Sequence, residues 1–586
     1  MQTVHAQTLE PILFSSKQDL TVTEQISPHT IISSEELEND SSVVDSLKNI
    51  PGVEVSKTGI GLTQASLSIR GSEGRHVLIL IDGVKVFDPT DVGGTLNLGF
   101  LNTLDIEKIE VLQGSQSLLH GSSAIGGVVN IITKKVSDKN SLSISKGVFS
   151  QVSTENTIEL GSGLLYLNAF YKESSEFNVA REGSENDLSL SRGINMNHSI
   201  EFGKAELEST IKINDSFSEV DGFDSTSLVV DDESAYIKSK HYFLNEKLTY
   251  KNSSNKKNIF NLSYNKFDRT NKYTDYLSNL ITDKFSGSSV ETEWRSNTKI
   301  NKSNILYGIN TNHETFLSSD TPEQTMSIFD TFFNYGVGFD EQYLDAGLRL
   351  TTNADFGSYL VYNLGWEKKM SQFQTLSLLS KTGYKAPSIY QQKAPANSWG
   401  PVGNIDLAPE KSQGFELVYQ LLVGSASTSQ LALFYNEVSD FIGWETGTGY
   451  ANISKHITTG VELGTDYTTS TYSLGANFTG THHELSTGKD AQRKPDKVVN
   501  LNLTKFMGDQ HHFSINWNWK GRRFEYSGTT RYELKAYDTF DFDYVYKKSA
   551  YKILFGLENI FNRDYQVARG YAITGQVIKT SLVYQY

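Results

Sequence analysis

Cysteine is absent from the 586 residues of this chain. This absence excludes a disulfide framework, thiolate-ligated metal sites and a cysteine nucleophile. Compact catalytic or nucleotide-binding motifs are also missing: the sequence contains neither a Gly-x-Ser-x-Gly element nor a phosphate-binding glycine loop. The missing catalytic motif argues against an enzyme of a familiar class. The missing nucleotide-binding loop implies that any energy-requiring step is driven by an energy source outside this chain.

Long apolar runs are lacking too, since no uninterrupted stretch approaches the ~20 apolar residues of a membrane-spanning helix. Hydrophobic residues make up only 38% of the chain, and the mean hydropathy is -0.37. If the chain crosses a membrane, only a closed β-barrel can satisfy its backbone hydrogen bonds there. Aromatic residues, at 11%, suit a barrel with rings at its rims, although a large soluble β-protein has a similar composition.

Positive charge is in short supply, with 53 Lys and Arg against 68 Asp and Glu. The resulting net charge of -15 argues against a nucleic-acid partner, because such binding depends on clustered cations.

The most compactly apolar stretch of the chain, residues 67–133, is punctuated by glycines. Start and stop signals predict short helices over residues 33–37 and 43–47. Apolar runs predict strands beginning at residue 53 and over 66–70, 77–81, 106–112 and 128–133, and Asp82-Gly83 is typical of a tight turn. The sequence therefore predicts a small α+β domain.

From about residue 138 onward, strands alternate polar and apolar residues, as in Phe513-Ser514-Ile515-Asn516-Trp517-Asn518-Trp519-Lys520. A soluble sandwich also alternates, so the connections must distinguish the two folds. They alternate in length: residues 563–574, 522–534 and 481–496 are long links, whereas 546–550, 507–511 and 203–204 are short ones. Such alternation is typical of outer-membrane barrels.

Length arithmetic agrees with a barrel, since roughly 450 residues over about 22 strands leave ~20 residues for each strand and its connection. We predict a transmembrane β-barrel of about 22 antiparallel strands with the N-terminal α+β domain as a plug inside its lumen. A lumen this wide would leak unless it were filled.

Several motifs point to one family. The first domain contains Ile69-Arg70-Gly71, Leu80-Ile81-Asp82-Gly83-Val84 and residues 121–133; the second contains Gly383-Tyr384-Lys385-Ala386-Pro387, Leu407-Ala408-Pro409-Glu410-Lys411-Ser412 with Glu416, Gly460-Val461-Glu462 and residues 557–565. In this order and spacing the chain resembles TonB-dependent outer-membrane receptors over essentially its whole length.

The resemblance implies three parts: residues 1–34, a leader remnant and mobile TonB-interacting segment; residues 35–137, the plug; and residues 138–586, the barrel. It implies a bacterial outer-membrane location, a lipid and lipopolysaccharide environment, a monomer, and TonB with its inner-membrane complex as the energising partner. The TonB-binding residues would be Glu10, Pro11, Ile12, Leu13, Phe14, Ser15 and Ser16. Pro11 would remove one ladder donor from an added strand. Residues 1–6 end like a signal-peptide cleavage site, or are an ordinary terminus.

The resemblance also implies a latch between plug and barrel. The family's two plug arginines usually face two barrel glutamates, which Glu410 and Glu416 would match. Arg70 matches one arginine, whereas Gln113 replaces the other within Gln113-Gly114-Ser115. We therefore expect a weaker latch, with carboxylates that have raised pKa values or recruit other donors. The alternative is that both glutamates lie in water at the lumen wall.

Among the family's members, the cobalamin (vitamin B12) receptors have the greatest overall likeness, and ferric-siderophore receptors are the alternative. No cofactor is implied for chemistry, but Ca²⁺ is suggested by acidic residues in two outer loops, because this ion takes 6–8 oxygen ligands. A solvated acidic surface is the alternative. The acidic residues are Glu182, Glu185, Asp187, Asp221, Asp224, Asp231 and Asp232.

Substrate contacts are expected from the plug's outward apices, where Phe87 could instead be a core residue. The residues concerned are Thr63, Gln64, Ser66, Phe87, Asp88, Thr90, Asp91 and Val92. A haem receptor is disfavoured, because adjacent His482 and His483 would point to opposite sides of a strand and are placed in a long outer loop. A passive porin is disfavoured because it needs no plug.

Overall fold

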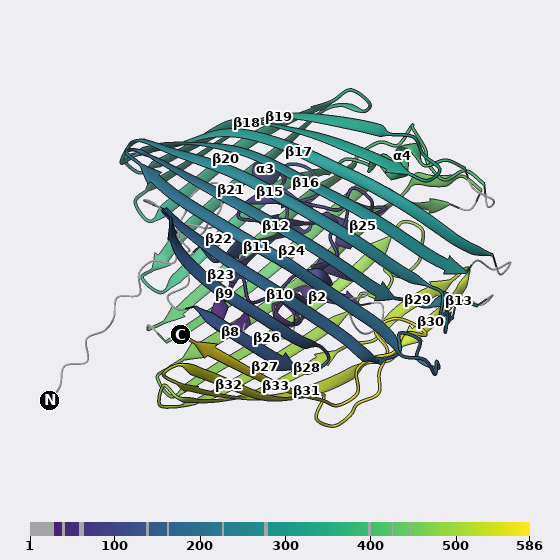
Figure 1. Ribbon diagram of the computed structural model, residues 1–586. Coiled ribbons are helices and arrows are strands. Elements are labelled where there is room, and N and C mark those ends of the chain that lie inside the picture. The colour runs from purple at the N-terminus through teal and green to yellow at the C-terminus, as the bar shows by residue number, and fades with distance from the viewer. Residues whose placement is uncertain are drawn as a thin grey trace.

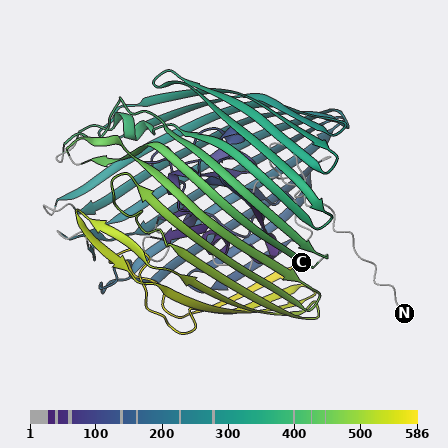
Figure 2. The ribbon, with the colours of Figure 1, turned by 180° about the vertical axis from the view of Figure 1, so that it is seen from behind.

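The computed structural model describes residues 28–37, 42–57, 64–135, 140–160, 163–224, 228–274, 279–396, 400–424, 426–445 and 447–586. A closed barrel encloses a smaller N-terminal domain, whose purple ribbon lies inside the barrel from the front and from behind (Figures 1 and 2). Among the described residues, no helix has the length and apolar character needed to cross a bilayer.

The barrel has 22 antiparallel strands and confirms the predicted fold class. Its strands are β8 (Ser141–Lys146), β9 (Ser150–Leu160), β10 (Gly163–Phe177), β11 (Asp187–Phe202), β12 (Ala205–Glu219), β15 (Tyr236–Ser253), β16 (Lys256–Thr274), β17 (Leu280–Ile300), β18 (Ser303–Ser318), β19 (Gln324–Phe339), β20 (Gln342–Asn353), β21 (Gly357–Ser371), β22 (Gln374–Lys385), β23 (Glu410–Val423), β24 (Ser427–Glu445), β25 (Gly449–Thr468), β26 (Tyr472–Leu485), β27 (Lys497–Met507), β28 (His511–Lys520), β31 (Tyr537–Lys548), β32 (Tyr551–Glu558) and β33 (Val577–Gln585).

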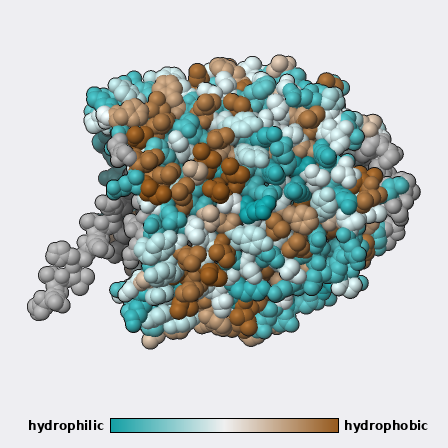
Figure 3. Space-filling view, in the orientation of Figure 1, coloured by the Kyte–Doolittle hydropathy of each residue, from teal (hydrophilic) through white to brown (hydrophobic). Residues whose placement is uncertain are grey.

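The barrel closes where the last strand pairs with the first, with Leu582 opposite Ile144. Side chains alternate between the lumen and the outside along each strand, as the period of two requires. In β19, for example, Phe329 and Phe333 are exposed on the outside, whereas Asp330 and Asn334 are buried in the lumen. Apolar side chains gather on the outer wall toward the end that holds the C-terminus (Figure 3), so the barrel presents an apolar surface to lipid.

Turns at the end that holds the C-terminus are short, whereas the other end has the long connections, as predicted. Residues 549–550 form a short turn, whereas residues 386–409, 521–536 and 559–576 form long loops. Two of the long loops contain small hairpins, and the first long stretch after β22 contains a helix. These elements are β13 (Gly222–Phe223), β14 (Val229–Val230), β29 (Arg523–Ser527), β30 (Thr530–Leu534) and α4 (Ile389–Lys393).

The plug is built on a five-stranded sheet of order β1-β6-β7-β4-β5 and a separate pair, β2-β3. Asp82 and Gly83 join β4 to β5 with φ of 53° and 81°, the left-handed pair that a type I′ turn needs. The elements are β1 (His29–Ser33), α1 (Ser34–Leu37), α2 (Val43–Leu47), β2 (Val53–Lys57), β3 (Ala65–Ile69), β4 (Val77–Ile81), β5 (Val84–Val86), β6 (Ile106–Gln113), α3 (Ser117–His120) and β7 (Gly127–Thr133), with 3₁₀ turns at Gly74–His76 and Leu98–Phe100.

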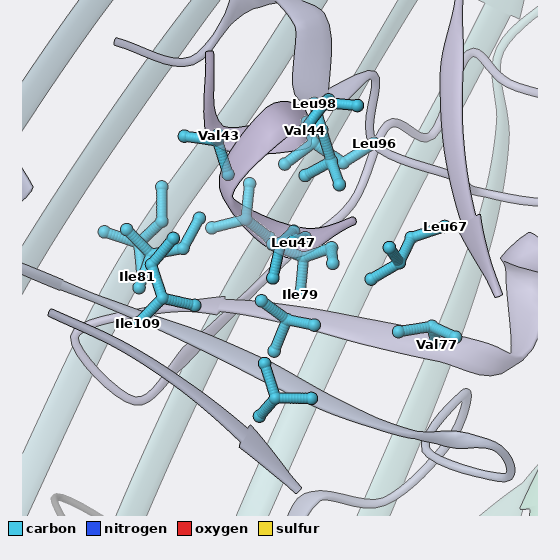
Figure 4. Close-up of a cluster of buried hydrophobic side chains, with 14 of the residues drawn as sticks. Val43, Val44, Leu47, Leu67, Val77, Ile79, Ile81, Leu96, Leu98 and Ile109 are labelled. Carbon is cyan, nitrogen blue, oxygen red and sulfur yellow. The ribbon is translucent and has the colours of Figure 1, made fainter. Parts of the chain in front are cut away.

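The plug has an apolar core, in which α2 packs on the sheet and to which Phe243 and Phe267 of the barrel wall contribute. Val43, Val44 and Leu47 of α2 lie over Ile79 and Ile81 of β4 (Figure 4). The predicted helices and the strands near 53, 66–70, 77–81, 106–112 and 128–133 are confirmed to within two residues. A core of this kind lets the plug keep its shape inside a polar lumen.

Two expectations about local structure were wrong. Residues 29–33 were assigned to a mobile segment but form β1. This strand pairs with β6, with Thr30 opposite Val111 and Ile32 opposite Ile109. His482 and His483 were placed in a long outer loop but lie within β26, whose pairing with β25 extends to Leu485.

Candidate functional site

Arg70 lies where the plug meets the barrel wall, and it binds carboxylates from two strands. Its Nη1 lies 2.9 Å from Glu416 Oε2 in β23, and its Nη2 lies 2.7 Å from Glu462 Oε2 in β25. The three side chains are only 7%, 6% and 2% exposed. One face of the guanidinium also stacks on the Phe434 ring, whose centre is 4.4 Å away.

Burial alone would lower the pKa of Arg70, but the carboxylates of Glu462 and Glu416 hold it above its ordinary value. The backbone of Arg70 has φ of 53°, and the next residue, Gly71, is also left-handed. This tight turn after β3 projects the guanidinium outward from the sheet to the barrel wall. The plug is thus fixed by a buried, charge-assisted contact.

Glu410 does not take part in this cluster, which corrects the predicted pairing. Its Oε1 lies 2.9 Å from Arg75 Nη2, and its Oε2 lies 2.7 Å from His76 Nε2. Burial lowers the pKa of His76, so the neutral ring donates its Nε2–H to Glu410. Glu410 is fully buried and does not lie in water at the lumen wall. The turn before β4 places Arg75 and His76 beside it, and both donate to its carboxylate.

Gln113 lies beside Arg70 but does not replace the missing cation. Its Oε1 accepts a hydrogen bond of 3.4 Å from Arg70 Nη2, and its Nε2 donates to Pro51 O at 2.6 Å. The barrel carboxylates recruit other donors, one of the two outcomes expected from the missing arginine. Sequence reasoning missed Arg75, His76 and Glu462 as partners, although Glu462 ends the Gly460-Val461-Glu462 motif.

Further ion pairs distribute the contact between plug and barrel around the lumen. Lys48 Nζ lies 3.2 Å from Asp541 Oδ2, and Lys520 Nζ lies 2.9 Å from Glu54. Asp105 of the plug pairs with Lys212 of β12. The plug is therefore fastened to several walls of the barrel at once.

The predicted substrate residues at the plug apex differ in their accessibility. Gln64 and Val92 are exposed, and Ser66 and Phe87 are half-buried, whereas Thr63 lies outside the described residues. Phe87 lies under Lys85, whose Nζ is 4.3 Å from the ring centre.

The polar apex residues are used within the protein in this arrangement. Asp88 and Thr90 are 7% and 1% exposed, and the Asp88 carboxylate accepts from the Thr90 backbone N–H at 2.8 Å. Asp88 also lies 3.6 Å from Arg269 of β16, while Asp91 Oδ1 accepts from the backbone of Gly93 and Thr95. Direct substrate contact by Asp88 and Thr90 would need the apex to rearrange.

A strap formed by Lys385 and residues 386–393 covers the apex. Ser388 Oγ donates to Val92 O at 2.6 Å, and Lys385 Nζ donates to Gly93 O at 3.2 Å. The cavity beneath the strap measures about 40 Å³, far below the roughly 300–1,000 Å³ of small-molecule sites. A large ligand must bind above the strap or displace it.

The predicted acidic residues separate into a compact cluster and turn-stabilising residues. Glu185, Asp187 and Asp221 place carboxylate oxygens within 4.8 Å of one another. Burial, together with the neighbouring Asp221 carboxyl group, raises the pKa of Glu185 to about 7, and burial raises that of Asp221.

The remaining acidic residues have other roles. Asp231 accepts from Asn178 Nδ2 at 2.9 Å and Ser184 N at 2.7 Å, which joins the two loops. Asp224 and Asp232 accept backbone N–H groups in their own turns, and Glu182 is exposed. Three of the seven predicted residues thus lie close enough to share one cation.

The predicted TonB-binding residues, Glu10 to Ser16, lie outside the described residues, as do residues 1–6. Near the start of the described chain, Glu35 of α1 pairs with Lys547 at the rim that carries the short turns.

A closed barrel with an apolar outer wall and an ion-paired plug defines a gated outer-membrane receptor. Comparison with known families gives the same class: residues 21–128 match the TonB-dependent receptor plug domain, and residues 156–560 match the TonB-dependent receptor-like β-barrel. The chain belongs to the TonB-dependent receptor family, whose members are transport receptors of the bacterial outer membrane.

Solved structures of similar fold extend over nearly the whole chain. The siderophore receptor PirA of Acinetobacter baumannii aligns with a TM-score of 0.81 at 19% identity, covering 97% of this chain and 100% of PirA. A point mutant of the ferric enterobactin receptor PfeA of Pseudomonas aeruginosa gives 0.82 at 16%, covering 98% and 100%. The ferric-catecholate import receptor Fiu of Escherichia coli gives 0.82 at 14%, covering 98% and 99%.

Proposed function

We propose that this protein takes up a ferric siderophore across the outer membrane with energy supplied through TonB. The observation that carries the proposal is the plug, which fills the lumen and is fastened by buried ion pairs. A bulky nutrient cannot diffuse past it, so uptake requires an outside source of work to release the plug.

The lining of the mouth near the strap supports an aromatic, anionic chelate as substrate. Half-buried Tyr390 of α4 packs edge-on against the fully buried Phe316 and the half-buried Tyr450, with ring centres 5.9 and 6.3 Å away. Arg269 lies 5.1 Å from the Phe285 ring centre and is paired with Asp88 in this arrangement, so it would meet a ligand once the apex rearranges. Aryl groups stack on such rings, and a cation favours negative charge on the ligand. The siderophore receptors of similar fold add support for this substrate class over cobalamin.

Binding to the purified protein tests this proposal. Ferric complexes of a catecholate, a phenolate and a hydroxamate siderophore are compared with cyanocobalamin and haemin. A ferric chelate is expected to bind, and Tyr390→Ala or Arg269→Ala should weaken it at least tenfold. Tyr551→Ala, at the opposite rim, is the matched control and should bind normally. Binding of cyanocobalamin alone would reject the proposal.

Cobalamin remains the second candidate, and the acidic loop cluster is the observation that favours it. Glu185 Oε1 and Asp221 Oδ2 are buried oxygens of neighbouring carboxyl groups, and among the described residues no N–H or hydroxyl group donates to either, as expected of ligands for a shared cation. We propose Ca²⁺ for this position, since hard carboxylate oxygens are its preferred ligands. Cyanocobalamin binding that appears only with Ca²⁺, and is lost in Glu185→Gln, would support this alternative.

The TonB-binding role of Glu10 to Ser16 has its own test. Deleting these seven residues should abolish uptake while leaving ligand binding at the cell surface unchanged, because the plug elements that contact the barrel all follow them in the chain. Loss of surface binding would mean that the segment is structural.

A further inference from the structure

The barrel wall contains a seam between β21 and β22 that the hydrogen-bond ladder does not close. From the end with the short turns, the two strands pair only as far as Asn363 and Lys381. Beyond this point β21 still pairs with β20 as far as Gly357, and β22 still pairs with β23 as far as Lys385. Both strands therefore run along the seam without pairing with each other.

Thr382 lies where the seam begins. Its Oγ1 accepts from Tyr362 N at 2.7 Å and donates to Tyr362 O at 3.3 Å, so a side chain replaces the next backbone bonds of the ladder. Tyr362 thus directs its backbone groups toward β22, and by the period of two Leu360 and Ser358 do the same. Among the described residues, no partner is found on this side for the backbone groups of Leu360 and Ser358.

The plug occupies the matching edge of β22. We name residues 115–123, which contain α3, the serine segment; α3 lies against β20, β21 and β22. The backbone groups of β22 that bond to this segment belong to residues 382, 384 and 386, the alternate positions that would face β21 if the ladder continued. The bonds are Ser115 Oγ to Thr382 O (2.9 Å), Tyr384 N to Ser117 Oγ (3.3 Å), Ser123 N to Tyr384 O (3.2 Å) and Ala386 N to Ser122 Oγ (3.1 Å).

The ring of Tyr384 packs against β21 along the seam. Tyr384 is 1% exposed, and its ring centre lies 5.3 Å from that of Tyr359 and 6.4 Å from that of Phe356. Burial of this ring stabilises the separated strands. The Tyr384 hydroxyl is also buried, however, and no described residue bonds to it, which destabilises the same arrangement. Opposing contributions of this kind are expected of a junction that has two arrangements.

The strap over the plug apex continues directly from the end of β22. Lys385 is the last residue of β22, and its Nζ donates to Gly93 O of the apex. Ser388 Oγ bonds the strap to Val92 O. A displacement of the end of β22 therefore also displaces the strap relative to the apex.

We propose that residues 382–386 form a switch strand, which exchanges its partner between the serine segment of the plug and the facing edge of β21. With the plug in place, the serine segment bonds to the switch strand. When the segment withdraws, the β21–β22 ladder extends in its existing register, with Leu360 opposite Tyr384 and Ser358 opposite Ala386.

The exchange has two consequences for the protein. Withdrawal of the serine segment replaces backbone hydrogen bonds instead of leaving the edge of β22 unpaired, which lowers the free energy that plug movement requires. It also closes the seam in the wall and moves the strap from the apex. The switch does not depend on which nutrient is transported.

Disulfide trapping in the full-length protein tests the proposal, because the chain contains no cysteine of its own. In the extended ladder the Cα atoms of residues 358 and 386 would lie about 5.5 Å apart, within the range of a disulfide. The seam pair is Ser358→Cys with Ala386→Cys, and the ladder pair, at equivalent positions in the existing ladder, is Leu364→Cys with Ser380→Cys. The seam pair is expected to oxidise at least tenfold more slowly. Equal rates would overturn the proposal, since the seam would then be closed at rest.

Substitutions in the serine segment should release the switch strand. Three of them remove its side-chain bonds: Ser115→Ala, Ser117→Ala and Ser122→Ala. Three matched substitutions remove plug hydroxyls that bond to no described residue of β22: Ser33→Ala, Ser56→Ala and Ser34→Ala. Added to the seam pair, the first set should speed oxidation at least tenfold and the second set should leave it unchanged. No change with the first set, or an equal rise with both, would overturn the proposal.

Hydrogen exchange gives the reciprocal measurement. Once the seam pair is oxidised, Tyr384 O bonds to β21, so the Ser123 amide that it accepted should exchange at least tenfold faster than in the reduced protein. Oxidation of the ladder pair should not change this amide, and amides of β4 should not change in either protein. Unchanged exchange at Ser123 would overturn the proposal, because the two pairings would then coexist; an equal rise in β4 would also overturn it, as general loosening of the plug.

Discussion

Arg70 is the residue on which the union of plug and barrel most depends. Its guanidinium is shared between Glu416 and Glu462, which belong to different strands. A buried ion pair adds modest net stability, but removing one partner leaves an uncompensated charge in a site of low dielectric. Removing Arg70 should therefore lower the free energy of unfolding by more than the net amount that its ion pairs add.

Arg70→Ala is expected to destabilise the plug by about 3–5 kcal/mol, because two buried carboxylates lose their cation. Hydrogen exchange of the amides in β6 and β7 measures this as faster exchange. Arg192→Ala is the control: its pair with Asp215 is 64% exposed on the arginine side and should contribute at most about 1 kcal/mol. Equal effects of both substitutions would contradict the assignment.

Gln113→Arg is expected to strengthen the latch. Glu462 Oε1 is buried and finds no hydrogen-bond donor among the residues that the structure describes, and the Gln113 side chain already contacts Arg70 next to it. A second guanidinium would supply the missing donor and should slow exchange in β6 several-fold. The same measurement on Gln113→Ala separates added charge from altered packing, and faster exchange in Gln113→Arg would show that the larger side chain does not fit.

At the scale of elements, the long loops on one side of the mouth are joined to one another. Residue 180 pairs with residue 571, and Arg181 pairs with Asp564, so the loop after β10 is fastened to the loop before β33. The acidic cluster of Glu185, Asp187 and Asp221 lies in the same assembly. Repulsion among these three carboxylates destabilises the packing of the loops. We therefore expect the stability of the loops to depend on pH.

The pKa of Glu185 is raised to about 7, so the folded loops bind a proton more tightly than unfolded ones. The contribution of Glu185 to loop stability is therefore complete below the ordinary pKa of glutamate and is lost as the pH rises through about 7. Hydrogen exchange in residues 178–186 should quicken across this interval, and Ca²⁺ at pH 7.5 should reverse the change. In Glu185→Gln the pH dependence should be reduced; an unchanged profile would exclude this carboxyl as the cause.

At the scale of the whole molecule, the plug and the barrel are held together by apolar as well as polar contacts. The barrel is closed by a hydrogen-bond ladder, and the plug folds around an apolar cluster (Figure 4) to which Phe243 and Phe267 of the barrel wall contribute. A second cluster packs Leu118 and Leu119 of the plug on Leu306 and Phe332 of the barrel, so the plug exposes apolar surface when it separates.

A chain that lacks residues 35–137 is expected to insert as an open pore. The lumen that the plug occupies would then admit solutes that the intact protein excludes. Cells that express it should become sensitive to vancomycin, whereas cells with the intact protein should remain resistant. Resistance despite normal amounts of the shortened protein in the outer membrane would mean that the outer loops close the barrel by themselves.

The sequence by itself determined the elements of this protein. Alternation in stretches such as Phe513 to Lys520 reflects a local period, and the lengths of the connections reflect which end of the barrel each strand reaches. The turn at Asp82-Gly83 is equally local, since it depends on two residues that tolerate positive φ. These signals do not require knowledge of any distant contact.

Only the tertiary structure decided which charges meet. Arg70 and Glu462 are 392 residues apart, and their contact depends on how the plug is rotated in the lumen and on the register of β25. The pairing of Glu410 with Arg75 and His76 depends on the same rotation. Long-range ion pairs are selected by geometry rather than by residue type, so a sequence with many carboxylates leaves their partners open.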